Sequence, residues 1–253
     1  MKLIKKIVKE SNFLITNYRF LQSSRYYFRF KIVSFVKHLY SYIFDLIKIK
    51  KNKIYTFEYL YPNLSDKTFT TPLDIQYFYQ DTWAAKKIFE LKPKIHYDIG
   101  SSAKTIGILS QFVPITMVDI RPLPIKLNNF NFIKGSITSL PFKDNSIESI
   151  SSLCVIEHIG LGRYGDEIDE FGSEKAIKEI KRVTKKNGII LISVPVFKKN
   201  AIFFNSHRAF TRDYILSLFS SCKLIEEKYI YYDKLENKYK PDFGTGLYIF
   251  KKY

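Results

Sequence analysis

The sequence predicts an α/β protein of the doubly wound class, with a mainly parallel sheet covered by helices on both sides. From residue 94 onward, short runs of apolar and β-branched residues alternate with helical patterns. This rhythm is typical of strands that are buried on both faces of a parallel sheet. Two further apolar runs follow the last helical pattern. They predict an antiparallel hairpin at one edge of the sheet.

The 253-residue chain divides by composition into three parts. Residues 1–55 predict a basic amphipathic helical segment. Residues 56–92 predict an irregular segment rich in Tyr and Phe and then a leading helix over 83–91, with Asp81 as its N-cap. Residues 93–253 predict the α/β domain. We expect the irregular aromatic segment to cover a ligand pocket of that domain.

Within the α/β domain, the apolar patterns predict each element in turn. Strands are expected at 95–99, 115–119, 131–134, 148–154 and 188–195, and helices at 103–112 and 173–186. Asn187 and Gly188 are expected to close the second helix, because both favour the left-handed conformation of a helix C-terminus. A helix over 212–221 then leads to the closing strands at 223–232 and 246–252.

Most of the positive charge lies at the N-terminus. Residues 1–53 hold 13 Lys and Arg against two acidic residues, a net charge of +11 out of +17 for the chain. Three interpretations compete: a solvated helical appendage, peripheral attachment to an anionic membrane surface, and nucleic-acid contact. Nucleic acid ranks lowest, because the basic residues do not recur around the predicted pocket. No run reaches 18 uncharged apolar residues, so no membrane span is expected.

The cysteine content predicts neither disulfides nor a metal centre. Cys154 and Cys222 both lie in apolar surroundings, and the sequence has no CxxC motif or His-rich cluster. No cleaved signal peptide is expected, because Lys residues interrupt the first ten positions. The sequence therefore predicts a cytoplasmic protein, or one held peripherally at the inner face of the membrane.

The stretch from His96 to Ser102 predicts a buried strand, a tight turn at Gly100 and the start of a helix. Such a turn offers free backbone N–H groups to a ligand at the carboxyl end of the sheet. About twenty residues later, the strand at 115–119 ends in Asp119. A carboxylate at this point can accept both hydroxyls of a ribose. The pair indicates a cofactor that contains a nucleoside.

Further motifs follow in order. They are Asp98-Ile-Gly100, Val118-Asp119, Leu140-Pro141-Phe142, Val155-Ile-Glu157-His158 and the run from Glu179 to Pro195. This ordered set, over residues 80–253, resembles class I S-adenosylmethionine-dependent methyltransferases. The segment EHIGLGRYGD at 157–166 resembles the signature of a bacterial family of uncharacterised methyltransferase-like proteins. The resemblance implies a Rossmann-like methyltransferase fold with S-adenosyl-L-methionine as cofactor.

By this resemblance, Asp98 would orient the ammonium group of the cofactor and Asp119 would hold its ribose. The full set of implied cofactor contacts is Asp98, Gly100, Ser101, Ser102, Asp119, Ile120, Gly135, Ser136, Ile137, Val155 and Glu157. Two features depart from the common pattern. The glycine-rich loop is reduced to Gly100, and Ser136 stands where many members carry an acidic residue that contacts the adenine amine. Backbone groups and Ile137 would then hold the adenine.

Methyl transfer to a neutral hydroxyl or amide requires a base that takes its proton. His158, just after the fourth strand, is the first candidate, because an imidazole titrates near neutral pH. His207 is the second. The alternative for His158 is a role in shaping the pocket or in packing. The glycine-containing loop from Gly160 to Phe171 is expected to contact the acceptor.

The expected acceptor contacts come from three segments: Tyr77, Tyr79 and Gln80; Arg163, Tyr164 and Asp166; and Arg208. Arg163 and Arg208 would clamp a phosphate or carboxylate. The predicted function is methylation of an oxygen or nitrogen on a small-molecule or glycan-linked acceptor, phosphorylated acceptors included, as in bacterial capsule or surface-polysaccharide biosynthesis. The alternatives are a non-catalytic ligand-binding or scaffold protein and a nucleic-acid methyltransferase. The latter is disfavoured because no Asn/Asp-Pro-Pro-Tyr-type motif follows the fourth strand.

Overall fold

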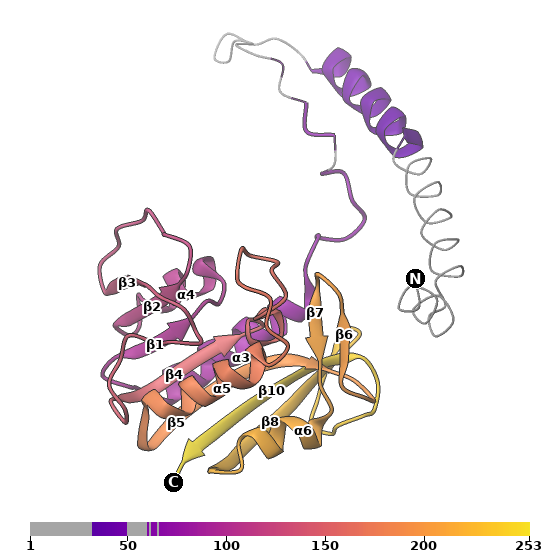
Figure 1. The fold of residues 1–253 in the computed structure, drawn as a ribbon. Helices are drawn as coiled ribbons and strands as arrows, with labels where there is room; N and C mark the ends of the chain where they lie inside the picture. The colour runs from indigo at the N-terminus through magenta and orange to yellow at the C-terminus, as the bar shows by residue number, and fades with distance from the viewer. Residues whose placement is uncertain (1–31, 50–59, 61, 65) are drawn as a thin grey trace. The chain divides into compact units, whose positions relative to one another are not determined.

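The computed structural model describes residues 32–49, 60, 62–64 and 66–253 (Figure 1). The chain forms two compact units, Met1–Pro72 and Leu73–Tyr253. In the first unit, residues 32–48 are helical. The remainder of the predicted helical segment lies mostly outside the described residues. Among the described helices, none combines the length and the apolar character that a membrane span requires.

The second unit is built on an eight-stranded sheet in the order β3-β2-β1-β4-β5-β10-β8-β9 (Figure 1). Its strands are β1 (His96–Ile99), β2 (Ile115–Asp119), β3 (Phe130–Lys134), β4 (Ile147–Leu153), β5 (Thr184–Val196), β8 (Cys222–Tyr231), β9 (Lys234–Glu236) and β10 (Gly244–Lys252). The neighbours from β3 to β5 pair parallel, whereas β10 is antiparallel to both β5 and β8. A separate antiparallel hairpin joins β6 (Ala201–Phe203) and β7 (His207–Ala209).

Helices cover both faces of the sheet. The helices α3 (Ile75–Leu91) and α4 (Ala103–Leu109) bury Trp83, Ile88 and Ile106 in one apolar cluster. The helices α5 (Gly172–Val183) and α6 (Arg212–Leu218) contribute to a second cluster, which includes Ile177, Ile180 and Ile215. A short 3-10 helix, η1 (Ile156–His158), follows β4. The doubly wound α/β class predicted from the sequence is therefore confirmed.

The closing strands differ in detail from the prediction. They do pair antiparallel, but β10 inserts between β5 and β8, and the short strand β9 forms the edge of the sheet. Neither β9 nor the β6–β7 hairpin was predicted, because strands of three residues leave too little pattern to detect.

The leading helix starts earlier than predicted. Asp74, not Asp81, is the N-cap of α3, and its carboxylate accepts the backbone N–H of Tyr77 at 3.1 Å. The segment up to residue 80 is therefore partly helical rather than irregular. Gln80 and Trp83 are three residues apart and both buried, as helical spacing requires. The many aromatic residues nearby made this spacing difficult to recognise in the sequence.

The predicted end of α5 is also wrong. The helix ends at Val183, and Asn187 lies inside β5 with φ of 64°. The pairing of β4 with β5 shifts register here, from Ile147 opposite Thr184 to Ser149 opposite Ile189. Asn187 therefore adopts its left-handed conformation at a bulge in β5 and not at the C-terminus of a helix.

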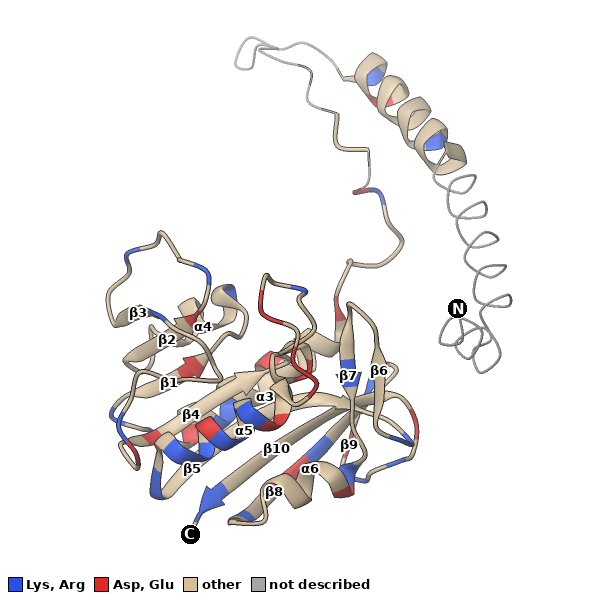
Figure 2. Ribbon diagram, viewed as in Figure 1, with Lys and Arg blue, Asp and Glu red and all other residues tan. Residues whose placement is uncertain are grey.

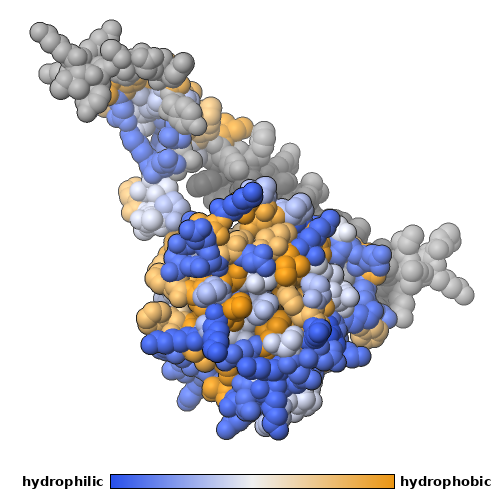
Figure 3. All heavy atoms as spheres, turned by 90° about the vertical axis from the view of Figure 1, so that its left-hand side faces the viewer, coloured by the Kyte–Doolittle hydropathy of each residue, from blue (hydrophilic) through white to orange (hydrophobic). Residues whose placement is uncertain are grey.

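Figure 3 shows the side of the molecule that lies on the left of Figure 1, where hydrophobic patches are interrupted by hydrophilic residues. A groove of about 560 Å³ lies between α3 and the end of α4, with Phe89 and Phe112 among its lining residues. Pro93 and Pro114, which also line it, precede β1 and β2. The groove is therefore at the amino edge of the sheet, opposite the predicted ligand site.

Candidate functional site

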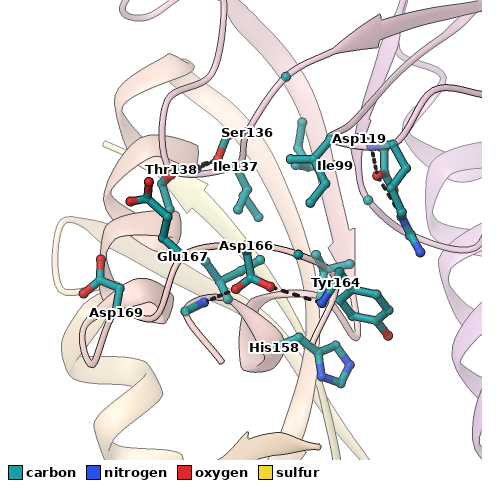
Figure 4. Close-up of a pocket in the computed structure, with 18 of the residues that line it drawn as sticks. Ile99, Asp119, Ser136, Ile137, Thr138, His158, Tyr164, Asp166, Glu167 and Asp169 are labelled. Atoms are coloured by element: carbon teal, nitrogen blue, oxygen red, sulfur yellow. Dashed lines mark hydrogen bonds and ion pairs between the residues drawn. The ribbon is translucent and has the colours of Figure 1, made fainter. Parts of the chain in front are cut away.

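A larger cavity, of about 750 Å³, lies at the carboxyl edge of the sheet. The ends of β1, β2, β3 and β4 form its floor, because parallel neighbours bring their carboxyl ends to one edge. Figure 4 shows the side chains that surround it. The lining residues from the strand ends are Ile99, Gly100, Val118, Asp119, Ile120, Arg121, Gly135, Ser136, Ile137, Thr138, Cys154 and Val155.

The side chain of Asp98 stabilises the turn after β1 through hydrogen bonds. Its carboxylate accepts the N–H of Ser101 at 3.0 Å, the hydroxyl of Ser101 at 2.6 Å and the hydroxyl of Ser151 at 2.5 Å. Burial raises the pKa of Asp98 to about 6, against the effect of these hydrogen bonds. Asp98, Ser101 and Ser102 do not line the cavity. In contrast to the prediction, Asp98 faces the protein interior and stabilises the turn.

His96, whose role was not predicted, extends this network of buried polar side chains. Its ring nitrogens lie 2.8 Å from the hydroxyl of Ser149 and 2.9 Å from that of Ser151. Burial lowers the pKa of His96 to about 3, so the imidazole is neutral. Gly100 completes the turn with φ of 72°, and a Cβ there would lie 3.0 Å from Val155 Cγ1. The absence of a side chain leaves the backbone open to a ligand.

Asp119 lines the cavity and is paired with Arg121. The Asp119 carboxylate accepts the backbone N–H of Arg121 at 2.8 Å and two guanidinium N–H groups at 3.3 and 3.2 Å. The guanidinium carbon lies 4.8 Å from the ring centroid of Tyr164, which approaches from the opposite loop (Figure 4). Arg121 was not predicted as a site residue, although a position two residues after Asp119 allows its guanidinium to pair with that carboxylate.

The end of β3 supplies the next part of the lining. Gly135, Ser136 and Ile137 all face the cavity, as does Ile120 after β2. The Ser136 hydroxyl lies 2.9 Å from that of Thr138, a lining residue that was not predicted.

The loop from Gly160 to Phe171 covers the cavity and has a defined structure. The Asp166 carboxylate accepts the backbone N–H groups of Gly160, Gly162 and Tyr164 at 2.6, 3.4 and 3.2 Å. These contacts place Tyr164, Asp166, Glu167, Ile168 and Asp169 around the cavity (Figure 4). Asp166 therefore lines the cavity and also folds the loop that covers it.

Arg208 does not face the cavity, in contrast to the prediction. It is buried and donates to the carbonyls of Ile159, Asp169 and Glu170 and to the Ser173 hydroxyl. These contacts attach β7 to the loop, so Arg208 is not free to clamp a substrate. Arg163, the other predicted clamp, is exposed and donates to Ser206 O at 3.1 Å.

His158 lines the cavity, and the backbone fixes its orientation. Its Nδ1 lies 2.6 Å from Ser206 O and therefore donates, which leaves Nε2 as the acceptor nitrogen. That Nε2 lies 3.7 Å from Glu157 Oε1. Burial lowers the pKa of His158 to about 4 and raises that of Glu157 to about 8. Glu157 is buried and does not line the cavity.

His207 lies outside the cavity. Its Nδ1 is 2.8 Å from the Ser206 hydroxyl, and its ring packs against Phe203 and Phe243 with centroids 4.9 and 5.7 Å apart. Burial lowers the pKa of His207. Within the described residues its Nε2 has no hydrogen-bond partner.

The predicted acceptor residues of α3 do not line the cavity either. Gln80 is buried and its Oε1 accepts from Ser193 Oγ at 2.6 Å and Cys154 Sγ at 2.8 Å. Tyr79 packs against the core of the α3 side. Tyr77 is partly exposed, and burial of its hydroxyl raises its pKa to about 12. Among the described residues, no group of three or more His, Cys, Asp or Glu side chains is placed to hold a metal ion.

Comparison with known proteins identifies the fold. The family model described as "Caenorhabditis protein of unknown function, DUF268" matches residues 135–234. No curated protein matches the chain. A putative sarcosine dimethylglycine methyltransferase from Galdieria sulphuraria superposes with a TM-score of 0.52 at 16% identity, covering 69% of this chain and 86% of that one. The small RNA methyltransferase HEN1 superposes with a TM-score of 0.54 at 16% identity, covering 80% of this chain and 27% of that one.

These similarities, together with the strand order, define the Rossmann-like fold of class I S-adenosylmethionine-dependent methyltransferases. The sheet is mainly parallel and carries antiparallel strands at its C-terminal end. At this level of identity the likeness extends to the fold.

Proposed function

We propose that the protein is an S-adenosylmethionine-dependent methyltransferase and that the cavity at the carboxyl edge binds the cofactor. One observation carries the proposal. Residues assigned to cofactor binding from the sequence alone converge from four different strand ends on one cavity: Gly100, Asp119, Ile120, Gly135, Ser136, Ile137 and Val155. The cavity volume of about 750 Å³ is in the range of small-molecule sites.

The chemical groups that line the cavity suit the parts of S-adenosylmethionine. The turn at Gly100 has no side chain over its backbone, so a ligand can approach closely. The Asp119 carboxylate would accept the ribose hydroxyls in place of the Arg121 guanidinium. Ile120 and Ile137 offer apolar contacts to an adenine ring. When bound, the cofactor supplies a methyl group that its sulfonium already activates.

His158 is the proposed proton acceptor. The hydrogen bond from Nδ1 to Ser206 O selects the tautomer whose Nε2 carries the lone pair. The low pKa keeps this nitrogen unprotonated at neutral pH. It would take the proton of the acceptor hydroxyl or amide while the nucleophile forms its bond to the methyl carbon. His207, which lies outside the cavity, is the weaker candidate.

The proposed acceptor is an oxygen or nitrogen nucleophile on a small or glycan-linked molecule, including phosphorylated ones, as in bacterial surface-polysaccharide synthesis. Arg163 and Tyr164 from the covering loop support this part, because they present a cation and an aromatic ring near the cavity. We place the reaction in the cytoplasm, with residues 1–53 as a peripheral membrane attachment.

Calorimetric titration with S-adenosylmethionine and S-adenosylhomocysteine tests the proposal. We expect both to bind, and Asp119→Ala to weaken binding by about 10- to 100-fold, because two charge-assisted hydrogen bonds are lost. Asp233→Ala is the matched control, since Asp233 is exposed and does not line the cavity. Absence of binding at millimolar ligand would contradict the proposal and favour a scaffold protein on this fold.

A further inference from the structure

Four segments at the carboxyl edge of the sheet expose apolar side chains around the cavity. They are the first turn of α3, the loop 120–129, the loop 160–171 and the β6–β7 hairpin, and the loops and the hairpin turn project on the upper side of Figure 1. Their exposed apolar residues include Ile75, Phe78, Ile125, Ile168, Ile202 and Phe204. Ile168 is 74% exposed and Phe204 is 82% exposed, so neither contributes to the core.

The hairpin is built to display two of these side chains. Phe203 is 39% exposed, and its ring contacts Phe197, His207 and Phe243. Its neighbours, Ile202 in the strand and Phe204 in the hairpin turn, are 58% and 82% exposed. The aromatic cluster supports a hairpin whose outer surface is apolar.

The hairpin end of this edge carries positive charge, whereas the loop 160–171 is net acidic, with Asp166, Glu167, Asp169 and Glu170 against Arg163. No acidic residue occurs between Phe197 and Thr211. Lys198 and Lys199 precede the hairpin, and Lys126 lies beside Ile125; within the part of the chain that the structure describes, none of the three forms an ion pair. Figure 2 shows Lys and Arg on the loop between β2 and β3, and both Lys/Arg and acidic residues on the loop that follows β4.

This combination favours a lipid surface over a protein partner. Lysine is depleted at protein–protein interfaces. In contrast, lysines beside protruding aromatic and aliphatic side chains suit an anionic bilayer, where the apolar groups enter the acyl boundary and the ammonium groups meet the headgroups. Ile202 and Phe204 are exposed on one hairpin that follows Lys198 and Lys199, so they can enter a bilayer without requiring a complementary groove.

We propose that the carboxyl edge of the sheet docks on an anionic lipid bilayer, with Ile202 and Phe204 of the β6–β7 hairpin inserted. The hairpin turn is joined to the site, because Ser206 O accepts from both His158 Nδ1 and Arg163 Nη1. Docking would therefore bring the cavity to the membrane surface. It follows, resting on the proposed function, that the methyl acceptor is an amphiphile held in the bilayer.

A position-specific fluorescence measurement on the full chain tests this docking. Phe204→Trp places an indole at the hairpin tip, and Phe112→Trp places one at an exposed site at the amino edge of the sheet. The native Trp83 is buried and gives a background that is measured in the wild type. Vesicles of phosphatidylglycerol and phosphatidylcholine with brominated acyl chains serve as the probe.

We expect the emission of Phe204→Trp to shift to shorter wavelength and to be quenched by the brominated chains, while Phe112→Trp stays unchanged. Because the reporter is local, the basic segment 1–53 cannot produce this result by itself. Vesicle-bound protein without quenching at position 204, equal quenching at both positions, or no vesicle binding would each overturn the proposal. Titration of the same variants with S-adenosylhomocysteine reports separately on the proposed function.

Discussion

At the scale of single residues, Glu157 is a carboxyl group whose environment disfavours its charge. It is buried, and within the described residues its Oε2 has no hydrogen-bond partner. Burial raises its pKa from 4.5 to about 8. Between these two values the folded protein retains a proton that the unfolded chain has released. The free energy of unfolding therefore falls as the pH rises through this window, and the loss is complete above pH 8.

Glu157→Gln removes the ionisation and keeps the shape of the side chain. We expect the variant to gain stability relative to the wild type as pH rises from 4.5 to 8, by up to about 1.4 kcal/mol for each pH unit. Urea unfolding at a series of pH values measures this difference. The contributions of His96 and Asp98 are the same in both proteins and cancel. Parallel stability profiles for the two proteins would show that Glu157 ionises freely in the folded state.

At the scale of elements, the covering loop depends on its first glycine. Gly160 has φ of 80°, and a Cβ at this position would lie 2.1 Å from the carbonyl oxygen of Asp169. Gly107 in α4 is the matched control, because a Cβ there would meet no atom within 4 Å. The two glycines therefore have opposite expected responses to the same substitution.

Gly160→Ala should destabilise the protein by about 2 kcal/mol or more, because the loop must adopt another backbone path. Gly107→Ala should stabilise it by about 0.5–1 kcal/mol, since alanine favours the interior of a helix. Urea unfolding of both full-length variants measures the difference. Similar effects at the two positions would mean that the loop does not hold the backbone conformation in which Gly160 has a positive φ.

At the scale of the whole molecule, the sequence predicted the sheet better than the site. The strands β1, β2 and β4 lie within about one residue of their predicted bounds, because each is a short apolar run between turn residues. Gly100 and Asp119 line the cavity because their position at the end of a strand determines the edge at which they lie, and their contact with a cofactor stays a prediction.

The direction of a side chain was the part that could not be predicted. Asp98 also stands near the end of a strand, yet it turns inward to Ser101 and Ser151. Arg208 was expected to contact substrate but binds carbonyls of the loop 160–171. Ser101 is only three residues from Asp98, but Ser151 is 53 residues away, and the Arg208 contacts span 38 and 39 residues. No local pattern encodes the distant contacts.

The most direct test of the central claim is a crystal structure of the protein with S-adenosylhomocysteine. We expect the ligand in the cavity at the carboxyl edge, with its ribose hydroxyls on the Asp119 carboxylate and the Arg121 guanidinium displaced from it. The adenine should lie between Ile120 and Ile137. A ligand bound elsewhere, or a cavity left empty with the Asp119–Arg121 pair intact, would contradict the assignment of this cavity as the cofactor site.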